Sequence, residues 1–135
     1  GEPWFEGIEP ALARGLMAIP AARAVEFGRG VKAGLMRGSQ HNDKWGEEMS
    51  LSDGADGALG GMASGAPIHV RITFKPPSGI SKPQETFNQV TGMMEELAIK
   101  GRHDPVIGPR ARPVVEAVAR LVIADLAIQG GYIDG

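Results

Sequence analysis

Three ionisable side chains of different kinds adjoin one another in the segment Gly101-Arg102-His103-Asp104-Pro105. An arginine offers a planar fork that matches a phosphate or a ring carbonyl, and a nearby carboxylate can act as a base. The flanking glycine and proline restrict how the backbone can present these groups. The segment therefore indicates either a site for anion binding and proton transfer or a solvated turn with a local Arg–Asp pair. Charged turns of the second kind are common.

A second polar segment, Lys75-Pro76-Pro77-Ser78-Gly79, directly follows an apolar stretch. A lysine at a strand end, followed by a rigid turn with a hydroxyl group and free backbone N–H groups, can cradle a phosphate. The segment lacks the GxxxxGK[ST] spacing of a P-loop, so an ordinary strand-ending turn is the alternative. Gly60 and Gly61 would allow the backbone to approach a planar ligand closely, or would simply make a loop flexible.

Other kinds of site have little support in the sequence. The three histidines, His41, His69 and His103, lack metal-ligand spacing, so we expect no metal site. The chain has no cysteine, which excludes disulfides and thiolate nucleophiles. No Ser-His-Asp arrangement is evident.

Composition limits the class of protein. The length of 135 residues suits one compact domain, and a net charge of −2 argues against a general nucleic-acid binder. No apolar run is long enough to span a bilayer, and the first residues show no signal-peptide pattern. We therefore expect a cytoplasmic protein with neither nucleic-acid nor membrane partners.

The elements that must hold these residues follow from hydrophobic spacing. A short helix is predicted from Pro10 to Ile19, ended by Pro20. A short strand is predicted over residues 24–27. Strict alternation from Ile68 to Lys75 predicts a half-buried strand with Ile68, Val70, Ile72 and Phe74 facing a core.

Between these segments, residues 38–65 form a glycine-rich irregular loop, which is the strongest candidate for a ligand loop. Residues 84–89 and 95–100 predict a hairpin around Thr91-Gly92, and a helix over residues 84–97 is the competing interpretation. Pro113 is predicted to open the last helix, which ends at Gly130-Gly131. Its apolar stripe comprises Val114, Val118, Leu121, Val122 and Ile128. The predicted fold class is α+β, an antiparallel sheet with helices packed on one side.

Taken in order, these segments resemble chorismate synthase. The resemblance rests on Gly1-Glu2-Pro3, Leu16 to Ala21, Ala24 to Gly28, Arg37 to Asp43, Ala58 to Gly65, Phe74 to Ile80, Lys100 to Pro105 and Pro109 to Asp125. The run Lys100 to Pro105 reads KGRHDP, the same as the pattern of that family. Nearly the whole chain, residues 1–135, is covered, as the C-terminal portion of a chorismate synthase domain with its β-α-β sandwich.

The resemblance implies roles for particular residues. Pro20, Ala21, Gly60, Lys75, Pro76, Pro77, Ser78, Gly79 and Arg102 fall where the family contacts reduced FMN. Asp104 falls where the family has a catalytic carboxylate that takes part in proton transfer near the flavin. The implied reaction, in the shikimate pathway, is the 1,4-elimination of phosphate from 5-enolpyruvylshikimate 3-phosphate to give chorismate. Members of the family are typically homotetramers.

The sequence also departs from the family pattern. Ser52 to Gly57 reads SDGADG where the family commonly reads SNHAGG, so Asp53 and Asp56 introduce carboxylates. The N-terminal half of the family, with its catalytic histidines and phosphate-binding arginines, has no counterpart in this chain. The alternative hypothesis is therefore a fragment or degenerate domain that folds and oligomerises without flavin binding or catalysis. In either case we expect the 135-residue chain alone to be inactive.

Overall fold

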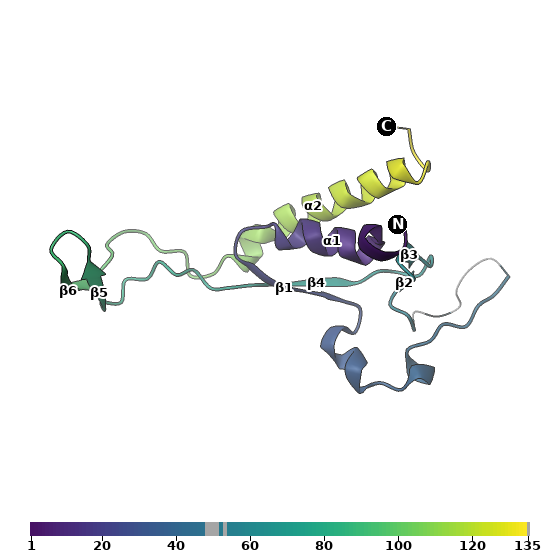
Figure 1. Ribbon diagram of the computed structural model, residues 1–135, viewed down its shortest axis with the longest axis horizontal. Coiled ribbons are helices and arrows are strands. Elements are labelled where there is room, and N and C mark those ends of the chain that lie inside the picture. The colour runs from purple at the N-terminus through teal and green to yellow at the C-terminus, as the bar shows by residue number, and fades with distance from the viewer. Residues whose placement is uncertain (48–51, 53, 135) are drawn as a thin grey trace.

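The computed structural model describes residues 1–47, 52 and 54–134. Two helices lie over a two-stranded sheet and form the body of the molecule, and a long arm leaves this body and ends in a hairpin (Figure 1). The predicted α+β class with antiparallel strands is confirmed. No helix of the described residues is long and apolar enough to cross a membrane.

The first helix, α1 (Ile8–Met17), buries an apolar face composed of Ile8, Ala11, Leu12 and Leu16. These positions recur at the three- and four-residue spacing that places side chains on one face of a helix. The helix begins two residues before the predicted start at Pro10. That proline still lies in the first turn, where its missing N–H group costs no hydrogen bond. A 3-10 helix, η1 (Trp4–Glu6), precedes α1.

The central sheet pairs β1 (Ala22–Phe27) with β4 (Val70–Phe74) in antiparallel register, with Val25 opposite Ile72. Both predicted strands are confirmed. Ile68 packs against the core, and Ile72 and Phe74 are half-buried. Val70 is 39% exposed, because it lies at the end of the sheet, opposite Phe27.

The last helix, α2 (Gly108–Gln129), begins five residues before the predicted start at Pro113. Pro109 occupies the second helical position and opens the helix instead, a place where proline is well tolerated. The predicted single stripe is also wrong. Val118 and Val122 contact α1, whereas Val114, Leu121 and Ile128 are exposed. Apolar residues on both sides of α2 made its buried face ambiguous in the sequence.

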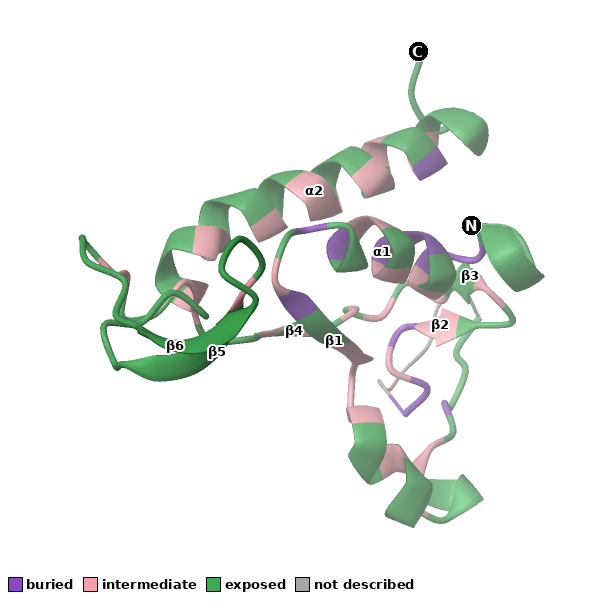
Figure 2. Ribbon diagram, turned by 60° about the vertical axis from the view of Figure 1, so that its left-hand side comes forward, coloured by how far each residue is buried: buried purple, intermediate pink, exposed green. Residues whose placement is uncertain are grey.

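Close contact between the two helices depends on Gly15 of α1. A Cβ atom at this position would lie 2.8 Å from Cγ2 of Val122 and 3.3 Å from Cγ1 of Val118. The buried cluster around this contact consists of Ile8, Ala11, Leu12 and Leu126. Figure 2 shows that buried residues concentrate on α1 and the start of β1, while the arm is exposed. The core is therefore small and lies between α1 and α2.

The segment between the two central strands begins with a 3-10 helix, η2 (Gly30–Leu35). Within residues 38–65 lie a second 3-10 helix, η3 (Gly38–Gln40), and a short hairpin of β2 (Ala58–Leu59) with β3 (Met62–Ala63). The carbonyl of Gly61 in this hairpin accepts a 2.8 Å hydrogen bond from the N–H group of Ile8. The first N–H groups of a helix have no partner within the helix, and the β2–β3 turn satisfies one of them at the start of α1.

The arm ends in a hairpin that pairs β5 (Gln84–Asn88) with β6 (Met93–Leu97). The predicted hairpin is confirmed and the competing helix is wrong. Gly92, with φ of 72°, donates a 2.8 Å hydrogen bond to the carbonyl of Asn88. The side-chain oxygen of Asn88 accepts hydrogen bonds from the N–H groups of Val90 and Thr91. An asparagine and a glycine therefore close the turn locally.

Candidate functional site

The end of α1, the end of β4 and the start of α2 meet at one place. A hollow of about 430 Å³ lies between them, and its lining combines an apolar floor with a carboxylate and a guanidinium. It is lined by Pro20, Ala21, Phe74, Asp104, Ile107, Arg110 and Ala111. A second hollow, of about 420 Å³, shares Phe74 and Ile107 and adds Lys75 and Pro76. The two hollows therefore adjoin along the end of β4.

A strained corner forms one edge of the first hollow. Ala21 has φ of 69°, in the left-handed region that residues other than glycine rarely adopt. The carbonyl of Ala21 accepts a 2.9 Å hydrogen bond from the N–H group of Lys75, which extends the pairing of β1 with β4. Strain of this kind costs about 1–2 kcal/mol and persists only where surrounding contacts fix it. The hydrogen bond thus ties Ala21 to Lys75, two of the residues predicted to contact a cofactor.

Two guanidinium groups hold Asp104. Arg110 donates to Oδ2 at 2.9 Å, and Arg102 donates to Oδ1 at 3.4 Å. The Asp104 side chain is 38% exposed, whereas those of Arg102 and Arg110 are 83% and 68% exposed. The carboxylate is thus fixed in orientation at the edge of the hollow, and both arginines remain accessible to an anion from solvent.

Arg110 is not among the residues that the sequence singles out. A helix that begins at Pro113 leaves Arg110 outside any predicted helix or strand. With α2 beginning at Gly108, Arg110 lies in the first helical turn and its side chain reaches back to Asp104. The signal that could have found it is Pro109, which is a better helix opener than the internal Pro113.

The remaining predicted residues of the second polar segment continue onto the arm. Pro77 is half-buried, and Ser78 and Gly79 are exposed. A Cβ atom on Gly79 would lie 3.6 Å from Nδ1 of His103, so the two polar segments run side by side there. The structure thus brings the segment after β4 alongside the segment that holds Arg102 and Asp104.

Gly60 does not line either of the two hollows. Its neighbour Gly61 contacts the start of α1, whereas Pro20 and Ala21 follow the end of that helix. Ten helical residues span about 15 Å, so Gly60 and the hollow lie at opposite ends of α1. A Cβ atom on Gly60 would meet nothing within 4 Å, so this face of the turn is open.

A second polar cluster surrounds Asp56, one of the two unusual carboxylates. Asp56 accepts hydrogen bonds from the guanidinium and the backbone N–H of Arg29, and it lies 3.1 Å from Nε2 of His41. Its side chain is only 10% exposed. Burial alone would raise the pKa of Asp56, but the Arg29 hydrogen bonds and the charges of Arg29 and His41 hold it below its ordinary value. Asp53, the other carboxylate, lies outside the described residues.

The volume and the charge of Asp56 affect two nearby residues, Gly28 and Glu9. A Cβ atom on Gly28 would collide with the Asp56 side chain, so only glycine leaves room for the carboxylate. Burial and the negative charge of Asp56 raise the pKa of Glu9 on α1, and His41 partly counters this effect. Asp56 therefore connects the residue pair that follows β1 with the segment after η3 through Arg29 and His41, whereas its charge repels that of Glu9 on α1.

Comparisons with known proteins agree on one family. A family model described as chorismate synthase matches residues 1–128. The chorismate synthase of Aeropyrum pernix is 47% identical over 132 residues, covering 95% of this chain and 35% of the relative. That of Methanosarcina mazei is 45% identical over 138 residues, covering 99% of this chain and 38% of the relative.

A solved structure gives the same result for the fold. The crystal structure of a chorismate synthase matches with a TM-score of 0.68 and 29% sequence identity, covering 94% of this chain and 32% of that one. The chain therefore spans about a third of the length of the relatives it matches. On the family match, the sequence identities and the shared fold, the chain belongs to the chorismate synthase family.

Proposed function

We propose that this chain forms one wall of the reduced FMN site of a chorismate-forming lyase. The observation that carries the proposal is the meeting of Pro20, Ala21, Lys75 and Asp104 around two adjoining hollows. These residues come from three separate segments of a chain that belongs to the chorismate synthase family.

The side chains around the hollows have the chemical character that a flavin nucleotide requires. Pro20, Ala21 and Phe74 offer an apolar surface for a planar ring, and the combined space has the size of small-molecule sites. Lys75 and the largely exposed Arg102 supply the cations that a phosphate group requires. In the proposal, Pro76, Pro77, Ser78 and Gly79 complete the phosphate-binding turn, and Gly60 contacts the flavin from elsewhere in the assembled site.

The reaction proposed is the 1,4-elimination of phosphate from 5-enolpyruvylshikimate 3-phosphate, which yields chorismate in the shikimate pathway. Reduced FMN supplies an electron-rich ring that assists loss of phosphate without net redox change. Asp104 takes part in proton transfer, and Arg102 and Arg110 hold its carboxylate in orientation. A cytoplasmic homo-oligomer is part of the same proposal.

The chain alone is expected to bind flavin weakly and to form no chorismate. Both hollows are open to solvent on one side and lie at the edge of a small core. An open half-site leaves an anionic substrate without most of the donors that hold it. A fluorescence titration of FMN against the chain measures the first expectation, and a tight, saturable complex would contradict it.

The catalytic proposal is tested by replacing the matching segment of the Aeropyrum pernix relative with this chain. We expect the chimera to form chorismate and Asp104→Asn to lower kcat by about 10²–10⁴-fold, the usual contribution of a positioned acid or base. Asp125→Asn is the matched control, because Asp125 is an exposed residue of α2 whose carboxylate accepts a hydrogen bond from the Gln129 side chain. Equal rates for the two variants would refute the role of Asp104.

A second candidate function is a domain that folds and oligomerises without flavin or catalysis. The observation that favours it is Asp56, a carboxylate that already engages Arg29 and His41. The same chimera separates the two candidates. A chimera that folds with the helix content of the relative but neither binds FMN nor forms chorismate would establish the second.

A further inference from the structure

His103 is the one ionisable residue between Gly101 and Pro105 that the proposed site does not use. Arg102 and Asp104 contact each other at 3.4 Å, and Arg110 also binds the Asp104 carboxylate. His103 stands between Arg102 and Asp104 in the chain but takes part in neither contact, and it is half-buried. The segment therefore directs its arginine and its carboxylate toward each other and its imidazole elsewhere.

The imidazole ring of His103 is fixed by a bond within its own segment. Its Nε2 lies 3.2 Å from the backbone carbonyl of Ile99. A carbonyl oxygen only accepts hydrogen bonds, so Nε2 carries the proton and donates it. The bond closes a tight loop of residues 99–103 that bends at Gly101, whose φ of 138° is rarely adopted by other residues. The orientation of the ring is therefore set locally.

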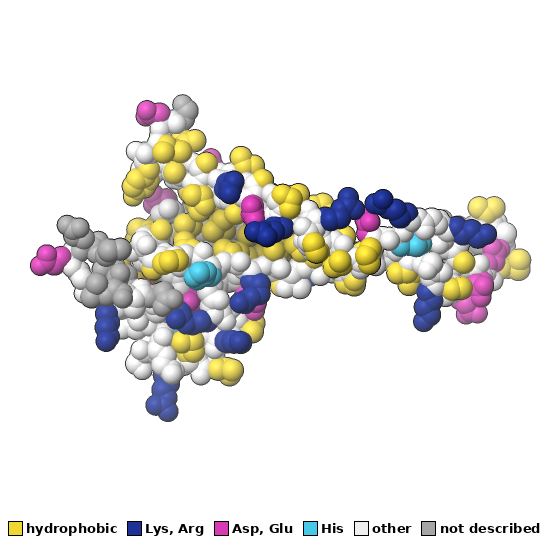
Figure 3. All heavy atoms as spheres, turned by 180° about the vertical axis from the view of Figure 1, so that it is seen from behind, with side chains coloured by type: hydrophobic (Ala, Val, Ile, Leu, Met, Phe, Trp, Pro, Cys, Tyr) yellow, Lys and Arg dark blue, Asp and Glu magenta, His cyan; other side chains and the backbone are white. Residues whose placement is uncertain are grey.

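The other ring nitrogen faces the second polar segment. Nδ1 lies 3.6 Å from the place that a Cβ atom on Gly79 would take, which is an ordinary van der Waals distance. No hydrogen bond between described residues joins residues 75–83 to residues 98–107. Figure 3 shows a histidine among the Lys and Arg side chains of the arm. The imidazole therefore lies between the two segments where no hydrogen bond holds them together.

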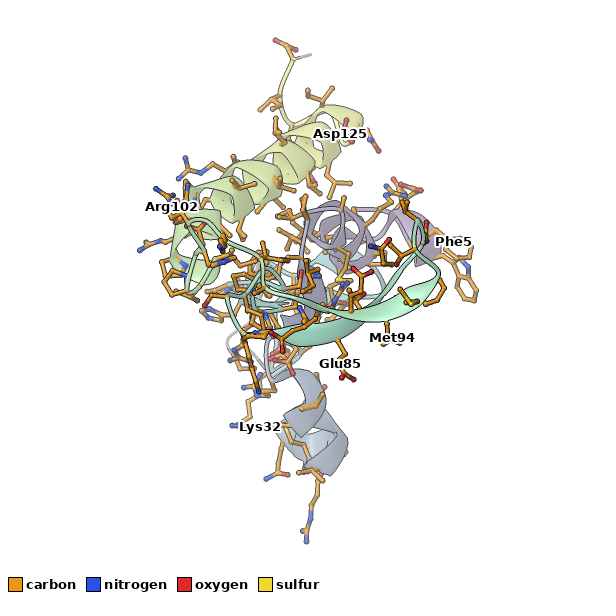
Figure 4. The ribbon with its side chains drawn as sticks, turned by 90° about the vertical axis from the view of Figure 1, so that its left-hand side faces the viewer. Phe5, Lys32, Glu85, Met94, Arg102 and Asp125 are labelled. Carbon is orange, nitrogen blue, oxygen red and sulfur yellow. The ribbon has the colours of Figure 1, made fainter. Side chains whose placement is uncertain are left out.

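The spacing of the two segments matters for the proposed phosphate site. Ser78 and Arg102 belong to different segments, and Figure 4 shows Arg102 projecting outward beside the start of α2. Groups that grip one small anion from two sides must be held at a fixed separation, and a shift of about 1 Å weakens such a site. Gly79 adjoins Ser78, and His103 adjoins Arg102. Contact between Gly79 and His103 therefore sets the separation of the two phosphate-binding groups.

We propose that His103 is a positioning residue that fits the site to the phosphate group of a flavin nucleotide. The imidazole acts as a spacer, because Nε2 anchors the ring to Ile99 and the edge with Nδ1 rests against Gly79. His103 touches no reacting group, so its effect is on binding through Ser78 and Arg102. The inference rests on the proposed function, and it adds a dependence on the phosphate group to it.

Glutamine and asparagine distinguish the two ends of the ring. The amide of a glutamine reaches the position of Nε2 and can donate to the Ile99 carbonyl as histidine does. The amide of an asparagine reaches only the position of Nδ1, so that carbonyl loses its donor. His103→Gln should therefore preserve the spacing of the segments, whereas His103→Asn and His103→Leu should lose it.

Nuclear magnetic resonance of the 135-residue chain tests the contact without any flavin. At pH 8, where imidazoles are ordinarily neutral, the nitrogen shifts of His103 should place its proton on Nε2. The Hε1 proton of the ring should show nuclear Overhauser contacts with the α protons of Gly79. A proton on Nδ1, or a ring without contacts to Gly79, would overturn the proposal whatever the flavin binding.

Two flavins, one with and one without a phosphate group, test the effect on binding. In the chimera with the Aeropyrum pernix relative, the dissociation constant of FMN should rise about threefold to tenfold in His103→Asn and His103→Leu, as expected for one lost hydrogen bond. His103→Gln should bind FMN as the parent chimera does. The dissociation constant of riboflavin, which has no phosphate group, should be the same in all four proteins.

His69→Leu is the matched control for these titrations. His69 is exposed, and its side chain makes no hydrogen bond within the described chain, so both dissociation constants should stay at their parent values. Circular dichroism verifies that each variant folds. Equal losses for FMN and riboflavin, or weak FMN binding by His103→Gln, would overturn this inference alone. A parent chimera that binds no FMN would refute the proposed function together with it.

Discussion

The carboxylate of Asp104 is held by two arginines that differ in distance and in origin. Arg110 belongs to the first turn of α2 and makes the shorter contact, whereas Arg102 lies two residues before Asp104 in the chain. A guanidinium presents two donors in one plane, so it can fix the orientation of a carboxylate as well as neutralise it. Arg110 is therefore the better candidate for orienting Asp104, and Arg102 is freer to meet an anion.

Two substitutions at Arg110 should distinguish its role in orienting Asp104 from the effect of its positive charge. In the chimera with the Aeropyrum pernix relative, we expect Arg110→Met to lower kcat by about 10-fold to 100-fold, because small misplacements of a catalytic group are costly. Arg110→Lys should recover part of this loss, since it restores the charge without the planar fork. Arg112→Met is the control, because Arg112 pairs with Glu116 on the same helix. The proposal fails if Arg110→Met and Arg112→Met have the same kcat.

Asp56 provides a pH-dependent test of stability. Its pKa in the folded chain lies below the ordinary value near 3.9, so its stabilising effect is present above that value and is lost as the pH falls through the folded pKa. Asp56→Asn should lower the free energy of unfolding by about 2 kcal/mol at pH 7, because it removes a largely buried carboxylate that pairs with the Arg29 guanidinium.

Urea denaturation at pH 7 and at pH 3 measures this effect. The difference between the parent chain and Asp56→Asn should narrow at pH 3, because the unfolded parent chain then binds a proton at Asp56 more readily than the folded chain does. Glu116→Gln is a suitable control, since its ion pair with Arg112 is exposed and contributes less than about 1 kcal/mol. A difference that stays constant between the two pH values would contradict the assignment.

At the scale of elements, the contact between α1 and α2 is limited by Gly15. Gly15→Ala should destabilise the chain by about 1–3 kcal/mol, because the new methyl group would be 2.8 Å from Cγ2 of Val122 in a packed interface. Gly34→Ala in η2 is the matched control, since a Cβ there meets nothing within 4 Å and lies in ordinary backbone space. Thermal unfolding compares the two, and equal midpoints would mean that the helices separate easily.

The elements that were predicted correctly owe their form to local pattern. Alternation of apolar residues is enough to define β4, and the Asn88 to Gly92 turn is enough to define the β5–β6 hairpin. The start of α2 was missed because two prolines, Pro109 and Pro113, both qualify as helix openers. The buried face of α2 was missed because it depends on α1, which lies far away in the sequence.

The same distinction applies to the candidate site. The two polar segments were found because each is contiguous in the sequence. The pairing of Asp104 with Arg110 and that of Asp56 with Arg29 were not found, because each requires a turn or loop of known path. The resemblance of sequence motifs identified the family, and the structure identified the arginine partners of Asp104 and Asp56.

At the scale of the whole molecule, the body and the arm divide the functional features between them. The body holds the small core and the Pro20–Ala21 corner, whereas the arm holds Arg102, Asp104 and the β5–β6 hairpin.

The packing of Leu126 against Ile8 and Leu12 also has a consequence for synthesis. The only buried cluster in the described part of the chain joins its first helix to its last, across more than a hundred residues. Contacts between such distant segments form late, because a long loop must close before they are gained. On the ribosome, α1 therefore emerges well before α2, the helix against which it packs. The packing of Leu126 against Ile8 and Leu12 can thus form only after more than a hundred further residues have been added to the nascent chain.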